Sequence, residues 1–344
     1  MLTMNYKKSK KILTRYKHKE LKALKEKELC LLKQKKSIVL AEKNMKHYKP
    51  NAKQAQFHKE GNVFHERLFL AGNRCGKTFC GAMEMVYHLT GLYPSWWQGV
   101  RFQRGIHAWA ASVTTEATRD ILQNIYIGNN TKQKQAIIPE YLVLNKTFKR
   151  QISGAVDTVT IQHKSGDIST LGFKSYDQGR EKFQGTSRHF IHLDEEPDID
   201  IYEECLLRTL DVKGSVILTM TPLKGMSALC SHFLQDTTQT KKVIQATWDD
   251  TNHLSAEDKL RLRASLRPHE VEAREKGVPA LGKGKVFPIK EEDISVKPFP
   301  IPPHFKKVFG LDFGWTNPTA IVWAAYDSED DTIYLYDAYS ATEK

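Results

Sequence analysis

The chain has 344 residues, of which 40% are hydrophobic, so it can bury a substantial core and is long enough for two domains, or for one large domain with additions. It contains no run of about 18 apolar residues, and its basic N-terminus lacks the apolar segment of a signal peptide, so neither a membrane-spanning helix nor a secretory leader is expected. The five cysteines are scattered without paired metal-ligand spacing, which favours reduced thiols in a cytoplasm.

The net charge of +12 comes from one segment. Residues 1–49 hold 15 Lys and one Arg against four Glu, a difference of +12, so the remaining residues are together neutral. Residues 7–46 contain no Gly or Pro and read as one charged helix. This helix is either solvated and partly frayed, or an arm that contacts a phosphate backbone or a partner protein with strong salt dependence.

From about residue 50 to 245, short apolar runs alternate with helical patterns. Such alternation predicts an α/β fold with a mainly parallel sheet and helices on both faces. The runs that predict strands are 68–71, 106–111, 157–162, 168–173, 189–193 and 215–219.

Beyond this core, residues 255–276 predict a helix that breaks at Pro268, and a connector with Gly and Pro follows at 277–288. The stretch KPFPIPPH is typical of a linker, and three strand patterns with turns between them follow it. The predicted organisation is a basic helical arm, a core domain, a lid or connector, a linker and a short C-terminal domain: residues 1–49, 50–249, 250–296, 297–304 and 305–344.

Residues 71–78, Ala-Gly-Asn-Arg-Cys-Gly-Lys-Thr, have the spacing of a phosphate-binding Walker A loop, with Ala71 in place of the first glycine. An apolar strand precedes the loop and a helical pattern follows it, as such a loop requires. The two glycines let backbone N–H groups close around phosphate oxygens, and the start of the helix adds the positive end of its dipole. Lys77 is predicted to reach the β- and γ-phosphates of ATP and Thr78 to bind Mg²⁺. The predicted ATP-binding residues of the loop are Gly72, Asn73, Arg74, Cys75, Gly76, Lys77 and Thr78.

Arg74 is an unusual residue inside this loop. A second fixed cation there can stabilise charge on the γ-phosphate during transfer, as an arginine finger does, so Arg74 is a candidate catalytic residue. The alternative is a surface arginine or one partner of a salt bridge.

The stretch HFIHLDEEPD, residues 189–198, predicts an apolar strand that ends in three carboxylates. Asp194 at the tip of the strand is predicted to hold Mg²⁺, and Glu195 to orient and deprotonate the attacking water as a general base. Glu196 is the second candidate for that base. The alternative is a helix N-terminus that favours acidic residues through its dipole.

Two further features have weaker assignments. The hydroxyls of Thr219 and Thr221 follow an apolar strand and can sense the γ-phosphate and pass its state onward, unless they are ordinary threonines before a turn. Upstream of the first core strand, Gln54 can read the edge of adenine through its amide donor and acceptor, unless it faces solvent.

Taken together, these motifs resemble those of the large terminase subunit of tailed bacteriophages, the DNA-packaging motor. The resemblance covers roughly residues 48–344, and the order and spacing of the motifs are more specific than any one of them. The motifs are Gln54-x-x-Phe57, AGNRCGKT at 71–78, ASVTTEATRD at 111–120, GREKFQGTSRHFIHLDEEPD at 179–198, TMTPLKG at 219–225, GVPALGKGKVFP at 277–288 and GLDFGWTNPTAIVWAA at 310–325.

The resemblance implies a RecA-like P-loop ATPase with a glutamate base and a small lid subdomain at 250–285. It also implies a homo-oligomeric ring at the portal protein of a procapsid, which drives double-stranded DNA inward in the host bacterial cytoplasm, and a small terminase subunit that selects the DNA. By position, Arg74 matches the family's loop arginine and Glu195 its catalytic base. Thr219 to Thr221 match the motif that couples hydrolysis to movement.

The family also carries an RNase H-like nuclease, in which about three carboxylates hold two Mg²⁺ or Mn²⁺ ions roughly 4 Å apart. Asp312 in GLDFG matches the first of these ligands. The others would come from segments after residue 344, so Asp312 is expected to be an orphan carboxylate and this polypeptide alone is expected not to cut DNA. Three strands of a larger sheet leave an open edge, so residues 305–344 are expected either to be poorly ordered or to pack against the ATPase domain.

Two alternatives to an ATP-driven DNA translocase stay open. One is a helicase of related fold, although the sequence after residue 305 does not resemble the second RecA-like domain that a helicase normally needs. The other is a truncated prophage remnant or assembly protein that binds ATP or partners without turnover. The intact Lys77, Thr78, Asp194 and Glu195 argue against the remnant, and the missing nuclease half argues for it.

Overall fold

The computed structural model describes Lys25, Met45 and residues 48–128, 136–150, 152–251, 253–279, 294–313 and 318–341. The chain divides into two compact units, Met1–Val286 and Phe287–Lys344. Apart from Lys25 and Met45, the predicted helix over 7–46 lies outside the described residues, as does most of the predicted connector at 277–288.

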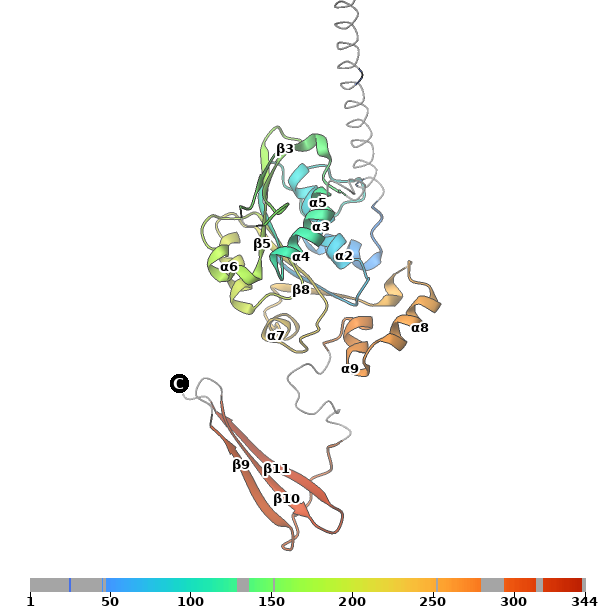
Figure 1. The fold of residues 1–344 in the computed structure, drawn as a ribbon, viewed down its shortest axis with the longest axis vertical. Coiled ribbons are helices and arrows are strands. Elements are labelled where there is room, and N and C mark those ends of the chain that lie inside the picture. Colours follow the sequence, from blue (N-terminus) through green and yellow to red (C-terminus); the bar gives the residue numbers. More distant parts are fainter. Residues whose placement is uncertain are drawn as a thin grey trace, which may run out of the picture. The chain divides into compact units, whose positions relative to one another are not determined.

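The first unit is built on an eight-stranded, mostly parallel sheet in the order β3-β4-β5-β2-β6-β7-β1-β8. Figure 1 labels β3, β5 and β8 of this sheet. Strands β5, β2, β6, β7, β1 and β8 run parallel, whereas β3, β4 and β5 form an antiparallel extension. The strands are β1 Glu66–Ala71, β2 His107–Ser112, β3 Val143–Phe148, β4 Val156–Gln162, β5 Ile168–Ser175, β6 Phe190–Asp194, β7 Ser215–Met220 and β8 Lys241–Ala246.

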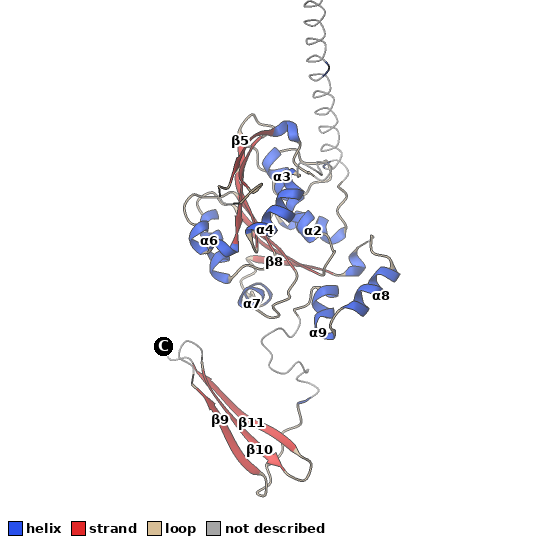
Figure 2. Ribbon diagram, viewed as in Figure 1, coloured by secondary structure: helices blue, strands red, loops and turns tan. Residues whose placement is uncertain are grey.

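Helices cover both faces of this sheet (Figure 2). The main helices are α2 Ala52–Glu60, α3 Lys77–Thr90, α6 Ile199–Thr209, α7 Ala228–Leu234 and α8 Ala256–Ser265. Strands β6 and β7 are buried along their whole length, as is typical of central parallel strands. Alternate residues of β1 enter different hydrophobic cores: Phe69 packs with residues of α3, and Leu68 with residues of α6 and α7.

The short helical segments matter for the site. Helix α4 Thr115–Ala117 continues through a π-helical stretch, Thr118–Gln123, into α5 Asn124–Ile127. The predicted helix at 255–276 does break at Pro268: α8 ends at Ser265 and α9 begins at Pro268. Proline is a common residue in the first turn of a helix. Helix α9 covers Pro268–Val271 and is followed by a π-helical turn at Glu272–Lys276.

The six strands predicted in the core are all present, but β3 and β8 were not predicted. Both lie at the edges of the sheet, where strands are only half buried and polar residues are tolerated. Strand β8 reads Lys-Lys-Val-Ile-Gln-Ala, and its two lysines hide the strand pattern.

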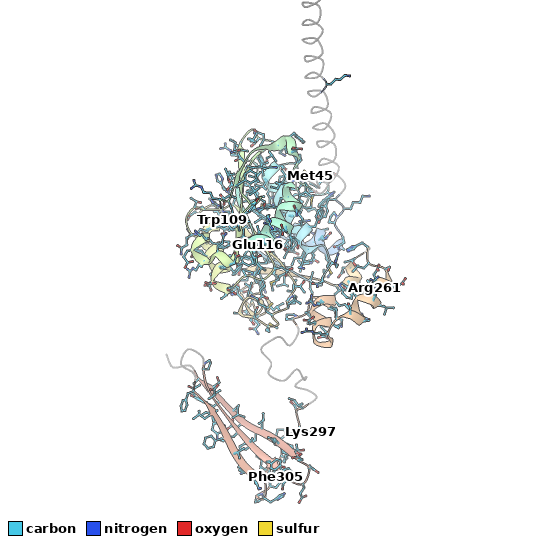
Figure 3. The ribbon with its side chains drawn as sticks, viewed as in Figure 1. Met45, Trp109, Glu116, Arg261, Lys297 and Phe305 are labelled. Carbon is cyan, nitrogen blue, oxygen red and sulfur yellow. The ribbon has the colours of Figure 1, made fainter. Side chains whose placement is uncertain are left out.

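The second unit contains the three strands predicted after the linker. They form an antiparallel sheet in the order β11-β10-β9, with β9 Lys306–Asp312, β10 Thr319–Asp327 and β11 Thr332–Ala341. Side chains project from both faces of this sheet (Figure 3), and every residue of β9 is exposed. Apolar residues such as Phe309 and Leu335 are among those exposed, at 67% and 69%.

Candidate ATPase site

The phosphate loop lies between the end of β1 and the start of α3, at the carboxyl edge of the parallel strands. Gly76 caps α3 with φ +73°, a left-handed conformation that glycine adopts without strain. Ala71, the last residue of β1, is not among the described non-glycine residues with positive φ, so the loop does not need a glycine there. Arg74 does have positive φ, +66°, and its side chain is exposed. The loop therefore holds a strained arginine that points away from the core.

Lys77 and Glu195 come together across this edge. The Nζ atom of Lys77 lies 3.2 Å from Oε1 of Glu195, at the end of β6. Glu195 has φ +59°, and its backbone N–H donates to the carbonyl of Thr219 on the neighbouring strand β7 at 2.9 Å. A strained backbone held by a neighbouring strand is a feature often found at functional sites. The expected base is thus held beside the expected phosphate-binding lysine.

Asp194 is the last residue of β6, and 2% of its surface is exposed. Its Oδ1 accepts a hydrogen bond of 2.7 Å from the hydroxyl of Thr219, and the hydroxyl of Thr78 also bonds to this carboxyl group. Burial, helped by the charge of Glu195, raises the pKa of Asp194 to about 6. A nearby cation stabilises the charge of a buried carboxylate, and carboxylate and hydroxyl oxygens are ligands that Mg²⁺ prefers. Asp194 and Thr78 therefore fit a Mg²⁺ ion.

Thr221 links the loop to the strand that carries the threonines. Its hydroxyl lies 2.9 Å from the carbonyl of Ala71 and 3.1 Å from Oδ1 of Asn73, and its backbone N–H donates to Oε2 of Glu195 at 3.4 Å. Thr221 therefore connects the phosphate loop to Glu195 through hydrogen bonds. The hydroxyl of Thr219 donates to the carboxylate of Asp194, so the two threonines bond to different carboxylates.

Gln54 contacts the phosphate loop. Its Nε2 donates to the carbonyl of Gly76 at 3.3 Å, and its Oε1 accepts from the backbone N–H of Asn51, which caps helix α2. The side chain is buried, so the alternative of a solvent-facing glutamine is wrong. Its predicted contact with adenine stays a prediction. In such a contact, the side-chain amide of Gln54 would bond to adenine as well as to Asn51 at the N-cap of α2.

Glu196 lies in a different environment from Glu195. It is 8% exposed, its pKa is raised by burial, and it bonds to the side chain of Ser227, the N-cap of α7. Among the described residues, its Oε2 has no hydrogen-bond partner. Lys77 is paired with Glu195 and not with Glu196. The geometry thus favours Glu195 as the base.

Cys75 is buried inside the loop. Burial raises the pKa of its thiol to about 11, so the thiol is neutral near pH 7 and contributes no charge to the phosphate site. Its Sγ lies 3.9 Å from the carbonyl of Asn73. The described cysteines, Cys75, Cys80, Cys205 and Cys230, are all free and buried.

Several contacts to the loop come from residues that the sequence did not single out. The indole N–H of Trp248 donates to the carbonyl of Asn73 at 2.8 Å, and the N–H of Asn73 donates to the carbonyl of Arg274 at 2.7 Å. Gly72 is required by close packing, because a Cβ atom there would lie 2.5 Å from the carbonyl oxygen of Glu275. The segment that resembles a lid therefore rests on the loop backbone. No sequence pattern reveals these contacts, because they join residues that are distant in the chain.

A buried histidine two residues before Asp194 in the chain was also missed. His192 on β6 has no exposed surface, and burial lowers its pKa to about 3, so the ring is neutral. It hydrogen-bonds to Tyr126 and to Thr219. Histidine within an apolar strand can be recognised in the sequence, but its partners cannot.

Asp312 is the last residue of β9 and belongs to the second unit. Among the described residues, no group of three or more His, Cys, Asp or Glu side chains is placed to hold a metal ion. Its predicted role as an orphan nuclease ligand therefore stays a prediction. Within the described part of the chain, no helix is long and apolar enough to cross a membrane.

The mostly parallel sheet flanked by helices, with a phosphate loop between β1 and α3, defines the P-loop ATPase fold. The family model "Terminase large subunit, T4likevirus-type, N-terminal" matches residues 68–294. The chain belongs to the terminase large subunit family.

Two relatives of this chain are themselves large terminase subunits. The chain is 35% identical over 316 residues to the large terminase subunit of Salmonella phage P22, covering 86% of this chain and 63% of that protein. It is 39% identical over 143 residues to that of Enterobacteria phage LP7, covering 42% of this chain and 30% of that protein. The chain thus spans less than two thirds of the length of each relative.

A solved structure shares the fold. The large terminase of a thermophilic bacteriophage superimposes with a TM-score of 0.52 at 15% sequence identity, covering 85% of this chain and 69% of that one.

Proposed function

We propose that this chain hydrolyses ATP and uses the energy to move double-stranded DNA into a procapsid. The observation that carries the proposal is the meeting of Lys77 and Glu195, at 3.2 Å, beside the buried Asp194. A phosphate-binding lysine, a metal-binding carboxylate and a base at one sheet edge are the parts that ATP hydrolysis needs. Membership of the terminase family supports the DNA substrate.

Each residue has a role in the proposed reaction. The Nζ of Lys77 and the loop N–H groups bind the phosphate oxygens of ATP, and Arg74 supplies a second cation towards the γ-phosphate. Glu195 accepts a proton from the attacking water once ATP has drawn Lys77 away from it. Asp194 and Thr78 hold Mg²⁺, which when bound neutralises charge on the phosphates. Thr221 passes the state of the loop onward through its contacts with Asn73 and Glu195.

The partners follow from the same family. We propose that the chain works as a homo-oligomeric ring with a small terminase subunit, at the portal protein of a procapsid in the host bacterial cytoplasm. The segment 1–49, which carries a charge excess of +12, is a candidate for contact with DNA or with one of these proteins.

The test is steady-state ATP hydrolysis by residues 1–344, with and without double-stranded DNA, beside Lys77→Ala and Glu195→Ala. Turnover in the wild type that both substitutions abolish, with stimulation by double-stranded DNA, supports the translocase. ATP binding without turnover would instead indicate the non-catalytic remnant. Strand separation of a DNA duplex would indicate the helicase.

A further inference from the structure

A continuous chain of hydrogen bonds runs through the buried core to Asp194. The hydroxyl of Tyr126 lies 2.9 Å from Nδ1 of His192, and Nε2 of His192 lies 2.8 Å from the hydroxyl oxygen of Thr219. The hydroxyl of Thr219 then donates to Oδ1 of Asp194 at 2.7 Å. None of the four side chains is more than 2% exposed. These links are therefore shielded from bulk water.

The chemistry of the end group fixes the direction of every bond in this chain. An ionised Asp194 only accepts hydrogen bonds, so the hydroxyl of Thr219 must donate its single proton to it. The oxygen of Thr219 then accepts from Nε2–H of His192, which leaves Nδ1 as the acceptor for the hydroxyl of Tyr126. The chain thus selects one tautomer of His192, and aligned donors strengthen one another.

The lack of a side chain at Gly81 leaves room for the imidazole ring of His192. A Cβ atom at Gly81, in helix α3, would lie 2.5 Å from Nε2 of His192, so the helix that follows the phosphate loop packs directly on the ring. Tyr126 comes from α5, directly after the π-helical stretch Thr118–Gln123. π-Helical turns of this kind are frequent at functional sites, and here the turn precedes the residue that begins the chain.

We propose that Tyr126 and His192 are positioning residues that hold Thr219 as a donor to Oδ1 of Asp194. The hydrogen bond from Thr219 occupies one lone pair of Oδ1. The other lone pairs of the Asp194 carboxylate stay available for Mg²⁺ and for the hydroxyl of Thr78. Outer groups that orient a metal ligand are commonly worth about 10- to 100-fold in metal affinity or activity. The inference rests on the proposed ATPase function. It proposes that Tyr126, which is far from the phosphate loop in the sequence, helps to orient the metal ligand Asp194.

The first experiment does not require turnover. Selective ¹⁵N labelling of histidine in the full chain reports the tautomer of His192, whose signals are identified by their loss in His192→Gln. The expected result is a proton on Nε2 and a hydrogen-bonded, unprotonated Nδ1, with the Nδ1 signal shifting towards that of a free lone pair in Tyr126→Phe. A proton on Nδ1 in the wild type would overturn the proposal.

The second experiment measures ATP hydrolysis against Mg²⁺ concentration. Tyr126→Phe and His192→Leu should lower kcat or raise the Mg²⁺ concentration for half-maximal activity by about 10-fold, with little change in the KM for ATP. His192→Gln keeps an N–H near the place of Nε2 and should recover much of the His192→Leu loss. The matched control is Tyr87→Phe, which also removes a buried tyrosine hydroxyl, one that bonds to the carbonyl of Met45.

A purely structural role would give a different pattern. Tyr126→Phe and Tyr87→Phe would then both lower the melting temperature and leave kcat and the Mg²⁺ dependence unchanged, which would overturn the proposal. If the wild type has no turnover, the proposed function fails while this inference stays testable. In that case Mg²⁺-dependent binding of a fluorescent ATP analogue is compared in the wild type and Tyr126→Phe, and equal Mg²⁺ dependence would overturn it.

Discussion

Lys77 and Glu195 form an ion pair, with Nζ 3.2 Å from Oε1. The side chain of Glu195 is 38% exposed, so the pair is only partly shielded from water and adds little stability. A weak pair of this kind can exchange readily when phosphate oxygens compete for the lysine. We therefore expect the phosphates of ATP, when it binds, to compete with the carboxylate of Glu195 for Lys77.

Replacement of Glu195 by Gln should separate binding from turnover. The change removes the base, which is commonly worth about 10²- to 10⁴-fold in rate, and it also frees Lys77 for phosphate. We expect kcat to fall by that factor, while ATP binds at least as tightly as to the wild type. Steady-state hydrolysis and titration with a fluorescent ATP analogue measure the two effects.

Glu196→Gln is the matched control for this substitution. The two residues are adjacent and carry the same group, but Glu196 is buried towards Ser227 and has no ion pair with Lys77. We expect Glu196→Gln to keep most of the turnover. A loss confined to Glu196→Gln would assign the base to Glu196 instead.

Arg74→Ala tests the cation inside the loop. If Arg74 stabilises charge on the γ-phosphate, its loss should lower kcat by about 10³-fold or more, with a smaller effect on ATP binding. Arg74→Gly adds a second readout, because the residue has φ +66° and glycine relieves the strain of that conformation. Thermal unfolding should therefore show Arg74→Gly to be at least as stable as Arg74→Ala. Unchanged ATP turnover in both variants would indicate that Arg74 is a surface arginine without a catalytic role.

The sequence predicts the parts of the site that are local and misses those that depend on distant contacts. Strand β1, the loop and α3 are contiguous, so composition and spacing predict them together. Strand β6 and the carboxylates of Asp194 and Glu195 are also contiguous in the sequence, so they are predicted together as well. The pairing of Asp194 with Thr219, by contrast, depends on β6 lying next to β7.

The same limit applies to the fold. Central strands such as β6 and β7 are apolar throughout and easily recognised, whereas the edge strand β8 carries two lysines and was missed. The left-handed backbone of Arg74 and Glu195 was not predicted either, since both residues normally avoid it. Strain at these two positions is imposed by the surrounding structure and has no sequence signal.

The predicted role of Asp312 as an orphan nuclease ligand can be tested by a DNA-cleavage assay. Asp312 lies at the end of an exposed strand, and no group of three or more acidic, Cys or His side chains among the described residues is placed to hold a metal. Supercoiled plasmid incubated with the protein and Mg²⁺ or Mn²⁺ should stay intact, and Asp312→Asn should behave as the wild type does. Cleavage by the wild type that Asp312→Asn abolishes would show that the metal site is complete.

The core of the first unit contains a buried charge cluster that should make the protein sensitive to acid. Glu84 and Arg67 are fully buried, with Arg67 Nη2 2.6 Å from Glu84 Oε1, and His58 Nδ1 lies 2.7 Å from Glu84 Oε2. Burial alone would raise the pKa of Glu84, but Arg67 and the hydrogen bonds from His58 and His88 outweigh it and hold that pKa well below its usual range. Burial lowers the pKa of His88.

Both shifts change stability in the same direction. His88 takes up a proton near pH 6.5 only in the unfolded chain, so the free energy of unfolding should fall as the pH drops below that value. The stabilisation from Glu84 is complete above pH 4.5 and is lost as the pH falls further towards its lowered pKa. Urea unfolding at pH 7.5, 6, 5 and 4 should show a decline that begins near pH 6.5 and continues at pH 4.

Glu84→Gln tests whether the buried charge cluster causes this decline in the free energy of unfolding. The variant leaves Arg67 buried without its counter-charge, which should cost about 3–5 kcal/mol at pH 7.5. The difference in the free energy of unfolding between the variant and the wild type should narrow at pH 4 and below, because Glu84 takes up a proton in the unfolded wild-type chain there and the wild type loses stability. Asp249→Asn is the control, because it breaks the ion pair with Lys259 at an exposed site and should change stability little at any of these pH values. An equally small change in Glu84→Gln would show that the buried pair does not stabilise the fold.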